Sequence, residues 1–208
     1  MQDCCASKGH ELERLAQQAD QRRVLIIVLI LNASMFVAEF VAGLIAGSAA
    51  LMADSVDMLG DATVYGLSLY ALSRSDRWKA GAAVAKGVFI LILGLGVVAE
   101  ILVKLRTGVA PVSTLMLVFG SLALVVNLYC LRLMWRFRAL DVNMSSTVEC
   151  SRNDAIANVG VIAAGAGVAL TGSFWPDIAV AAVIAALFLR SAIRMLGQAW
   201  PMLRHAHG

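Results

Sequence analysis

Apolar residues along the chain occur in six long runs, each close to the roughly 20 residues that an α-helix needs to cross about 30 Å of hydrocarbon. Polar or turn-forming stretches separate the runs, among them AGS at 46–48, SRSDRWK at 73–79 and TGSFWP at 171–176. The runs lack the alternation of transmembrane strands, and an open sheet cannot satisfy its backbone in lipid. The pattern therefore predicts six membrane-spanning helices, over 24–45, 49–72, 82–104, 112–132, 147–170 and 177–198.

Composition supports this prediction. Hydrophobic residues make up 60% of the 208 residues and charged residues 15%, and the mean hydropathy is +0.80, which is far from the balance of a soluble domain. The expected fold is all-α, with a polar arm over 1–23, a six-helix transmembrane domain over 24–200 and a short tail over 201–208. The first apolar run follows a polar arm and is long enough to span, so no cleavable signal peptide is expected. The arm and the tail leave no room for a second folded domain.

Basic residues are unevenly divided between the two sides of the predicted helices. Two of them, Lys104 and Arg106, lie on the side away from the termini. Thirteen lie on the side of the termini: Lys8, Arg14, Arg22, Arg23, Arg74, Arg77, Lys79, Arg132, Arg136, Arg138, Arg190, Arg194 and Arg204. Because cytoplasmic loops carry the excess of Lys and Arg, both termini should be cytoplasmic. The asymmetry also accounts for the net charge of +3, which needs no nucleic-acid partner.

The four cysteines, at 4, 5, 130 and 150, show no spacing typical of a disulfide framework. Cys4 and Cys5, together with His10, have two interpretations, capture of a soft metal ion or a plain flexible tail. Cys130 is expected to pack as a small hydrophobic residue. Cys150 lies among polar residues of the fifth predicted helix, so its role is interpreted together with theirs.

Polar and ionisable residues interrupt the predicted helices, although an ionisable group at bilayer depth costs at least about 2.5–3.5 kcal/mol. Such groups usually face the interior of a bundle and mark a pathway. They are Asn32, Glu39, Asp54, Asp57, Asp61, Lys86, Glu100, Asn127, Glu149, Cys150, Arg152, Asn153, Asp154 and Asn158.

Helical spacing groups four of these residues into two pairs. Asp57 and Asp61 are four residues apart, so they lie on one face of their helix, and Cys150 and Asp154 repeat this spacing in the fifth helix. If the pairs face each other, they present three carboxylates and one thiol, four ligands for a tetrahedral divalent ion such as Zn²⁺. Carboxylates stacked in a low dielectric repel unless they are protonated or bound to a cation. The pattern therefore predicts a metal site.

Other ionisable residues have structural interpretations. Asp54 falls at the start of the second predicted helix, where a carboxylate caps or stabilises the helix N-terminus, with a ligand role as the alternative. Lys86 is expected to extend toward the cytoplasmic interface, with a charge pair to Glu39 or Asp61 as the alternative. Arg152 is interpreted as structural.

Glycines predict close helix packing. Gly43 and Gly47 form a GxxxG pattern, and Gly165 and Gly167 supply further small positions in the fifth helix. Whether this packing lies within one chain or between two is left open by the sequence.

The stretch NASMFVAEFVAGLIAGSAALMADSVDMLGDA resembles the first two helices of the cation diffusion facilitators, a family of metal/proton antiporters. The family pattern has an Asn, a Glu and a Gly, followed by S-x-A-L-x-A-D-x-x-[HD]-x-x-x-D. The matching positions here are Asn32, Glu39, Gly43, Ser48, Ala50, Leu51, Ala53, Asp54, Asp57 and Asp61.

The resemblance continues to about residue 200. CSRNDAIANVGV is similar to the family's second [HD]-x-x-x-D pair, with Cys150 first and Asp154 last, and Glu100 fits an acidic position late in the third helix. WPDIAVAAVIAALFLRSAIRML is similar to the sixth helix, which Asp177 opens. The chain departs from the family at Cys150, where a His or Asp is usual, and in the short tail, where members usually carry a cytoplasmic, ferredoxin-like domain.

The resemblance implies an efflux carrier that exchanges cytoplasmic Zn²⁺ or Cd²⁺ for protons, with the ion held between the second and fifth helices by Asp57, Asp61, Cys150 and Asp154. Thiolate with carboxylates suits these ions better than Mg²⁺ or Ca²⁺, and Co²⁺, Fe²⁺ and Mn²⁺ remain open. If the thiol is not a ligand, Asn153 or Glu149 takes its place.

We expect a homodimer in a bacterial inner membrane, and neither an enzyme nor a cofactor other than the transported ion. Two alternatives are a non-transporting metal sensor or buffer and a proton-coupled carrier of small organic cations. All three histidines, at 10, 205 and 207, lie in the tails. Carboxylates, with or without the Cys150 thiol, would therefore carry the exchanged protons.

Overall fold

The computed structural model describes residues 3–71, 76–137 and 142–205, although the side chains at 3–18, 142–150 and most of those at 64–90 and 188–205 lie outside the description. It contains six helices and, within the described residues, no strand. The predicted all-α fold and the number of helices are confirmed. The helices are α1 (Asp3–Ala46), α2 (Ala49–Ala71), α3 (Asp76–Thr107), α4 (Ser113–Trp135), α5 (Val142–Thr171) and α6 (Trp175–His205).

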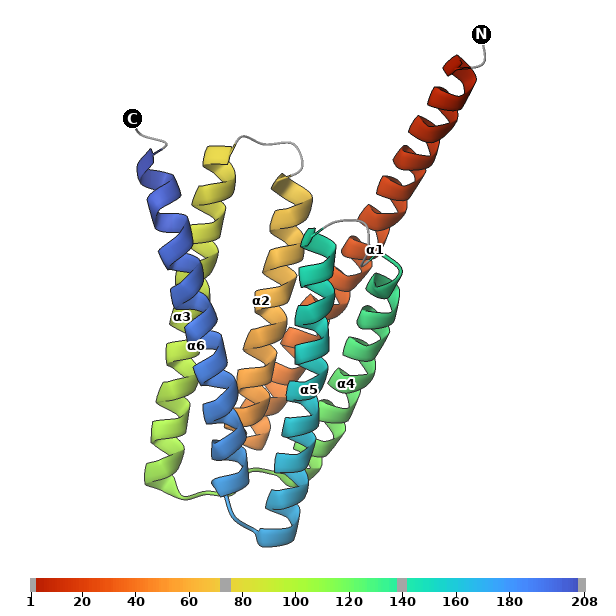
Figure 1. Ribbon diagram of the computed structural model, residues 1–208. Helices are drawn as coiled ribbons and strands as arrows, with labels where there is room; N and C mark the ends of the chain where they lie inside the picture. Colours follow the sequence, from red (N-terminus) through yellow and green to blue (C-terminus); the bar gives the residue numbers. More distant parts are fainter. Residues whose placement is uncertain (1–2, 72–75, 138–141, 206–208) are drawn as a thin grey trace.

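The expectation of a flexible N-terminal tail is wrong, because α1 already begins at Asp3. The arm is rich in Ala, Leu, Glu, Gln and Arg and lacks proline, so its local preference is helical. Figure 1 shows this first part of α1 extending beyond the bundle. The side chains of Cys4, Cys5 and His10 lie outside the described residues, so metal capture there is not tested.

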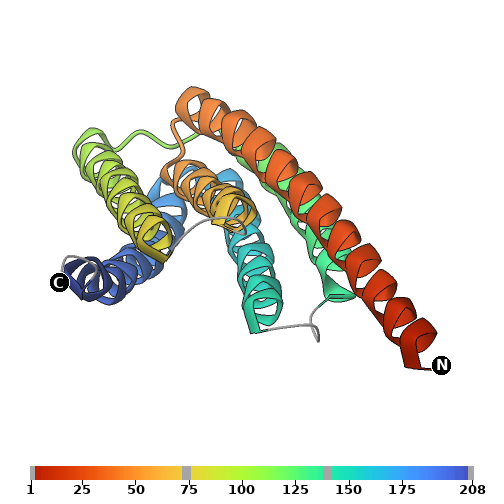
Figure 2. The ribbon, with the colours of Figure 1, turned by 90° about the horizontal axis from the view of Figure 1, so that it is seen from above.

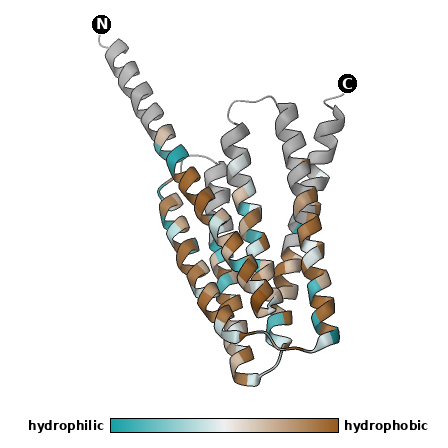
Figure 3. Cartoon of the chain, turned by 180° about the vertical axis from the view of Figure 1, so that it is seen from behind, coloured by the Kyte–Doolittle hydropathy of each residue, from teal (hydrophilic) through white to brown (hydrophobic). Residues whose placement is uncertain are grey.

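Three segments of the described chain are long and apolar enough to cross a membrane by length and composition: Ala19–Ala46, Ser113–Trp135 and Ser151–Thr171. Six crossings therefore remain a prediction. Large apolar side chains on the outside of the bundle fit a lipid environment; Ile45 is 70% exposed and Leu170 87%. Figure 3 shows that hydrophobic positions recur along the helices of the bundle.

The bundle is built around α2, which contacts every other helix. α3 pairs with α6 on one side of it, while α1, α4 and α5 lie on the other side (Figures 1 and 2). The first turn of α1 and the last turn of α6 lie at the same end of the molecule, which we call the termini end. The α1–α2, α3–α4 and α5–α6 connections lie at the opposite end, the loop end.

Glycines explain how the helices end and approach one another at the loop end. Gly47, Gly108 and Gly172 follow α1, α3 and α5 with φ of 58°, 65° and 63°, the left-handed conformation that commonly terminates a helix. Gly47 is therefore a turn residue, and the GxxxG interpretation is wrong for it. Gly43 confirms close packing within one chain, because a Cβ there would lie 2.8 Å from Cγ of Met52 on α2. A Cβ at Gly165 would likewise lie 3.0 Å from Cβ of Met116 on α4.

Candidate metal site between α2 and α5

Three carboxyl groups meet between α2 and α5. Asp57 and Asp61 lie one turn apart on α2 and are partly buried, and Asp154 of α5 is 9% exposed. The carboxyl of Asp154 faces those of Asp61 and Asp57 closely enough for the groups to repel one another as anions. The structure therefore brings together the three acidic residues that helical spacing selected.

The fourth predicted ligand cannot be placed, because the side chain of Cys150 lies outside the described residues, as does that of Glu149. Asn153, the other alternative, is an exposed residue of α5, and so is Arg152. No group of three or more His, Cys, Asp or Glu side chains within the described part of the chain has the spacing of a closed metal shell. Three carboxyl groups that repel one another need an ion or protons to draw them closer.

Asp54 does not cap α2, contrary to the sequence expectation. It lies in the second turn of the helix and is 1% exposed. The side-chain amide of Asn158 on α5 donates a 2.7 Å hydrogen bond to Oδ2 of Asp54, and Asn127 on α4 donates a 3.1 Å bond to Oδ1 of Asn158. This network of three buried residues links α2, α5 and α4. Asn158 follows Asp154 by four residues, the spacing that could have indicated their common face.

The cap of α2 comes from Asp177 at the start of α6. Its carboxylate accepts hydrogen bonds from the backbone N–H groups of Ala49 and Ala50, each at 3.0 Å, and from the Ser48 hydroxyl at 2.6 Å. The Ser48 oxygen in turn accepts from the backbone N–H of Leu51 at 3.1 Å. A carboxylate at this position satisfies exposed helix donors and complements the helix dipole.

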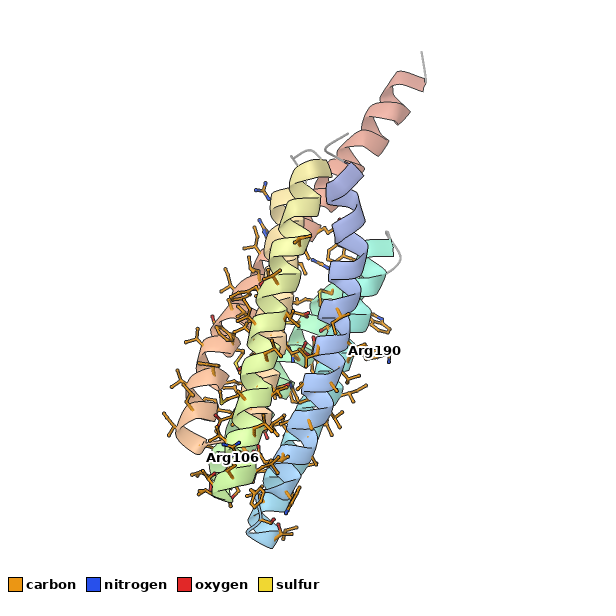
Figure 4. The ribbon with its side chains drawn as sticks, turned by 90° about the vertical axis from the view of Figure 1, so that its left-hand side faces the viewer. Arg106 and Arg190 are labelled. Atoms are coloured by element: carbon orange, nitrogen blue, oxygen red, sulfur yellow. The ribbon has the colours of Figure 1, made fainter. Side chains whose placement is uncertain are left out.

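Lys104 completes this cluster at the loop end. Its Nζ lies 2.6 Å from Oδ2 of Asp177, and the Lys104 side chain is 6% exposed. The charge of Lys104, one of the two basic residues predicted on the side away from the termini, is thus paired with Asp177. Arg106 is exposed at the loop end, whereas Arg190 lies farther along α6 toward the termini end (Figure 4).

Glu39 of α1 is fully buried, and no donor group within the described residues reaches either of its carboxyl oxygens. Among the described residues, its charged neighbour is the carboxyl of Asp54 on α2, and the two groups repel each other as anions. The predicted alternative of a charge pair between Lys86 and Glu39 or Asp61 is not tested, because the Lys86 side chain lies outside the described residues.

Residues 25–203 match the model of the cation efflux transmembrane domain. The chain belongs to the cation diffusion facilitator family. It is 26% identical over 174 residues to the metal cation efflux system protein CzcD of Cupriavidus metallidurans, covering 78% of this chain and 55% of that protein. A cadmium, cobalt and zinc/H(+)-K(+) antiporter of Bacillus subtilis is 24% identical over 184 residues, covering 82% and 59%. The zinc transporter ZitB of Yersinia pestis is 24% identical over 198 residues, covering 89% and 63%.

The chain thus spans between half and two thirds of the length of these cation efflux proteins. The family match and the apolar helices together make it an integral membrane protein. The acidic residues of α2 and α5 lie in the two sequence motifs that resemble those of the family.

Proposed function

We propose that the protein exports a divalent metal ion, Zn²⁺ or Cd²⁺, from the cytoplasm in exchange for protons. The observation that carries this proposal is the convergence of Asp57, Asp61 and Asp154 from two helices of the bundle. Such a cluster is costly in a membrane unless a cation neutralises it. The proposal also draws on the names of the relatives, which describe metal efflux, zinc transport and cadmium, cobalt and zinc antiport.

The ligands of the proposed site are Asp57, Asp61, Asp154 and Cys150. Cys150 precedes Asp154 by one turn of α5, so its position on the helix is on the same face. A thiolate among carboxylates favours Zn²⁺ and the softer Cd²⁺ over ions that require oxygen shells. Co²⁺, Fe²⁺ and Mn²⁺ are further substrates to test.

Proton exchange follows from the chemistry of these ligands. Each must be deprotonated to bind metal, so metal binding releases protons and metal affinity rises with pH. When metal leaves, protons allow the three carboxyl groups to remain together by sharing hydrogen bonds. The bundle then returns with protons in place of metal, which couples export to the proton gradient.

The position of the protein in the cell is part of the same proposal. The excess of Lys and Arg at the termini end, together with the burial of Lys104 at the loop end, favours a cytoplasmic location for both termini. A bacterial inner membrane and a homodimer complete the proposal. The proposed domain boundaries are those predicted from the sequence: an arm over 1–23, a six-helix domain over 24–200 and a short tail over 201–208.

Metal uptake into proteoliposomes, measured separately for Zn²⁺, Cd²⁺, Co²⁺ and Mn²⁺, tests this function. We expect Zn²⁺ and Cd²⁺ to move in exchange for protons, and Asp61→Ala to abolish the flux. Ile156→Ala is the matched control, because Ile156 is 64% exposed on the same helix as Asp154 and has no proposed role in the site. Binding without net flux would identify a sensor or buffer. Transport of a small organic cation that Zn²⁺ does not inhibit would identify a proton-coupled carrier of organic cations.

A further inference from the structure

Glu39 and Asp54 form a second acidic pair, separate from the three carboxyl groups of the proposed metal site. Glu39 comes from the C-terminal part of α1 and Asp54 from the second turn of α2, two helices that pack against each other. Both residues are buried, with exposures of 0% and 1%. Asp54 has one partner, the amide of Asn158, whereas no donor within the described residues reaches Glu39.

A buried carboxylate without a donor is unstable as an anion, and a second carboxyl beside it makes the anion still less stable. Among the described residues, no cation relieves this arrangement. α1 packs against α2 and α4. The charged group of α2 that acts on Glu39 is Asp54, and Asp57 follows it one turn farther along the helix. The titratable groups of α4 are Tyr129, Cys130 and Arg132; the first and last are exposed.

Cys130 of α4 is also too far along the bundle to act on Glu39. It packs against Val28 and its neighbours on α1. Val28 is 11 residues before Glu39, or about three helical turns. With no cation for the pair among the described residues, we consider neutralisation by a species that enters the bundle. A hard metal ion takes about six to eight oxygens, and two carboxyl groups offer four, of which Asp54 Oδ2 is already occupied by Asn158.

We propose that Glu39 binds an exchangeable proton, which it holds against the carboxyl of Asp54. A single proton converts the repulsion of the pair into a hydrogen bond between the two groups and needs no further ligand. This step is a transfer of one proton, taken up from water when the neighbouring metal site is empty and released to water when the pair ionises. The proton site is distinct from Asp57, Asp61 and Asp154.

Coupling of this proton to the metal rests on the function proposed above. Asp57 follows Asp54 by three residues on α2, and the two carboxylates repel each other electrostatically. A divalent ion bound at Asp57 would replace that repulsion with attraction and favour the ionised pair. Metal binding should then release the Glu39 proton in addition to any proton from the ligands.

Infrared spectroscopy of the full chain in lipid detects the proton directly, through the carbonyl band of a protonated carboxylic acid. We expect a band that moves when the protein is grown with ¹³C-glutamate, is absent in Glu39→Gln, and declines both with rising pH and on adding Zn²⁺. Glu100→Gln is the matched control, because Glu100 is another intramembrane glutamate and lies on α3; its variant should keep the band.

The same variants are compared by calorimetry with Zn²⁺ in buffers of different ionisation enthalpy. Glu39→Gln should bind the same number of Zn²⁺ ions as the wild type but release about one proton fewer per ion. Loss of a Zn²⁺ equivalent would make Glu39 a metal ligand and overturn the inference. So would a glutamate band that neither pH nor Zn²⁺ changes, or no such band in the ¹³C-labelled wild type, which requires no variant to fold.

Failure of the proposed function gives a different result. A wild-type protein that binds and transports none of the divalent ions would refute metal export. The pH dependence of the ¹³C-sensitive band would still decide whether Glu39 carries an exchangeable proton.

Discussion

Replacing Asp177 removes the carboxylate that joins three helices at the loop end. Asp177 is fully buried and accepts hydrogen bonds from Ser48, Ala49 and Ala50, while it neutralises Lys104. Asp177→Asn keeps the size of the side chain but loses the charge, and its amide N–H₂ would face donors. Lys104 would then be buried without its counter-ion. The structure therefore predicts a large loss of stability from a change that alters hardly any volume.

The two partners of the ion pair should not be equally sensitive. Breaking a buried pair by leaving one charge uncompensated costs about 3–5 kcal/mol, which is the expectation for Asp177→Asn. Lys104→Met leaves a carboxylate that still has three donors, so only one charge-assisted hydrogen bond is lost, at about 1.5–3 kcal/mol. Lys104→Met combined with Asp177→Asn should be more stable than Asp177→Asn alone, because no buried ammonium remains.

Thermal inactivation of purified protein in detergent or lipid would rank these variants. Rates of inactivation are suitable because membrane proteins often unfold irreversibly. Arg106→Met is the matched control: Arg106 is two residues from Lys104 on α3 but exposed, so its variant should lie within about 0.5 kcal/mol of the wild type. If the double variant is as unstable as Asp177→Asn, or if Lys104→Met is the more damaging single change, the explanation based on an uncompensated lysine is wrong.

Three further predictions concern the proposed site and the packing beside it. Asp57→Ala or Asp154→Ala should abolish metal flux in proteoliposomes while leaving the yield of folded protein close to normal; full transport by either variant would exclude that residue as a ligand. Cys150→His should retain Zn²⁺ transport and reduce Cd²⁺ transport relative to Zn²⁺, because imidazole is less soft than thiolate, whereas wild-type behaviour of Cys150→Ser for both ions would remove the thiol from the site. Gly43→Leu should lower thermal stability by about 1–3 kcal/mol, because even a Cβ would lie 2.8 Å from Met52, and an unchanged melting temperature would contradict the close α1–α2 contact.

Most of the fold could be predicted because hydrophobic length is a local property of the sequence. The second helix was expected at 49–72 and is observed at Ala49–Ala71. The largest discrepancies are at α1 and α6, whose polar ends continue past the apolar run as helix. Hydropathy finds the part of a helix that suits lipid, but helix propensity determines where the helix stops, and the arm before residue 24 has a high propensity.

The proposed site was predictable only where its residues share a helix. The spacing of Asp57 and Asp61 selected α2, and the spacing of Cys150 and Asp154 selected α5, because i and i+4 side chains occupy one face. The partners of Asp177 are 127 to 129 residues away in sequence, so local patterns could not reveal the cap of α2. The same limit led to the wrong expectation for Asp54. That expectation came from its position in the helix, whereas its role depends on a side chain from another helix.

α2 makes different kinds of polar contact with α6 and with α5. This difference indicates which of the two contacts a carrier could change during transport. At the loop end α6 is joined to α2 by a carboxylate with three hydrogen bonds and a buried lysine, whose energy does not depend on a transported ion. Against α5, α2 presents Asp57 and Asp61 to Asp154, groups that repel as anions and attract once protons or a metal ion bind. A ligand shifts a conformational equilibrium only through its different affinity for the two states. In the proposed carrier the contact between α2 and α5 is therefore the one that substrate binding can strengthen or weaken, while the capped contact with α6 is better suited to remain fixed.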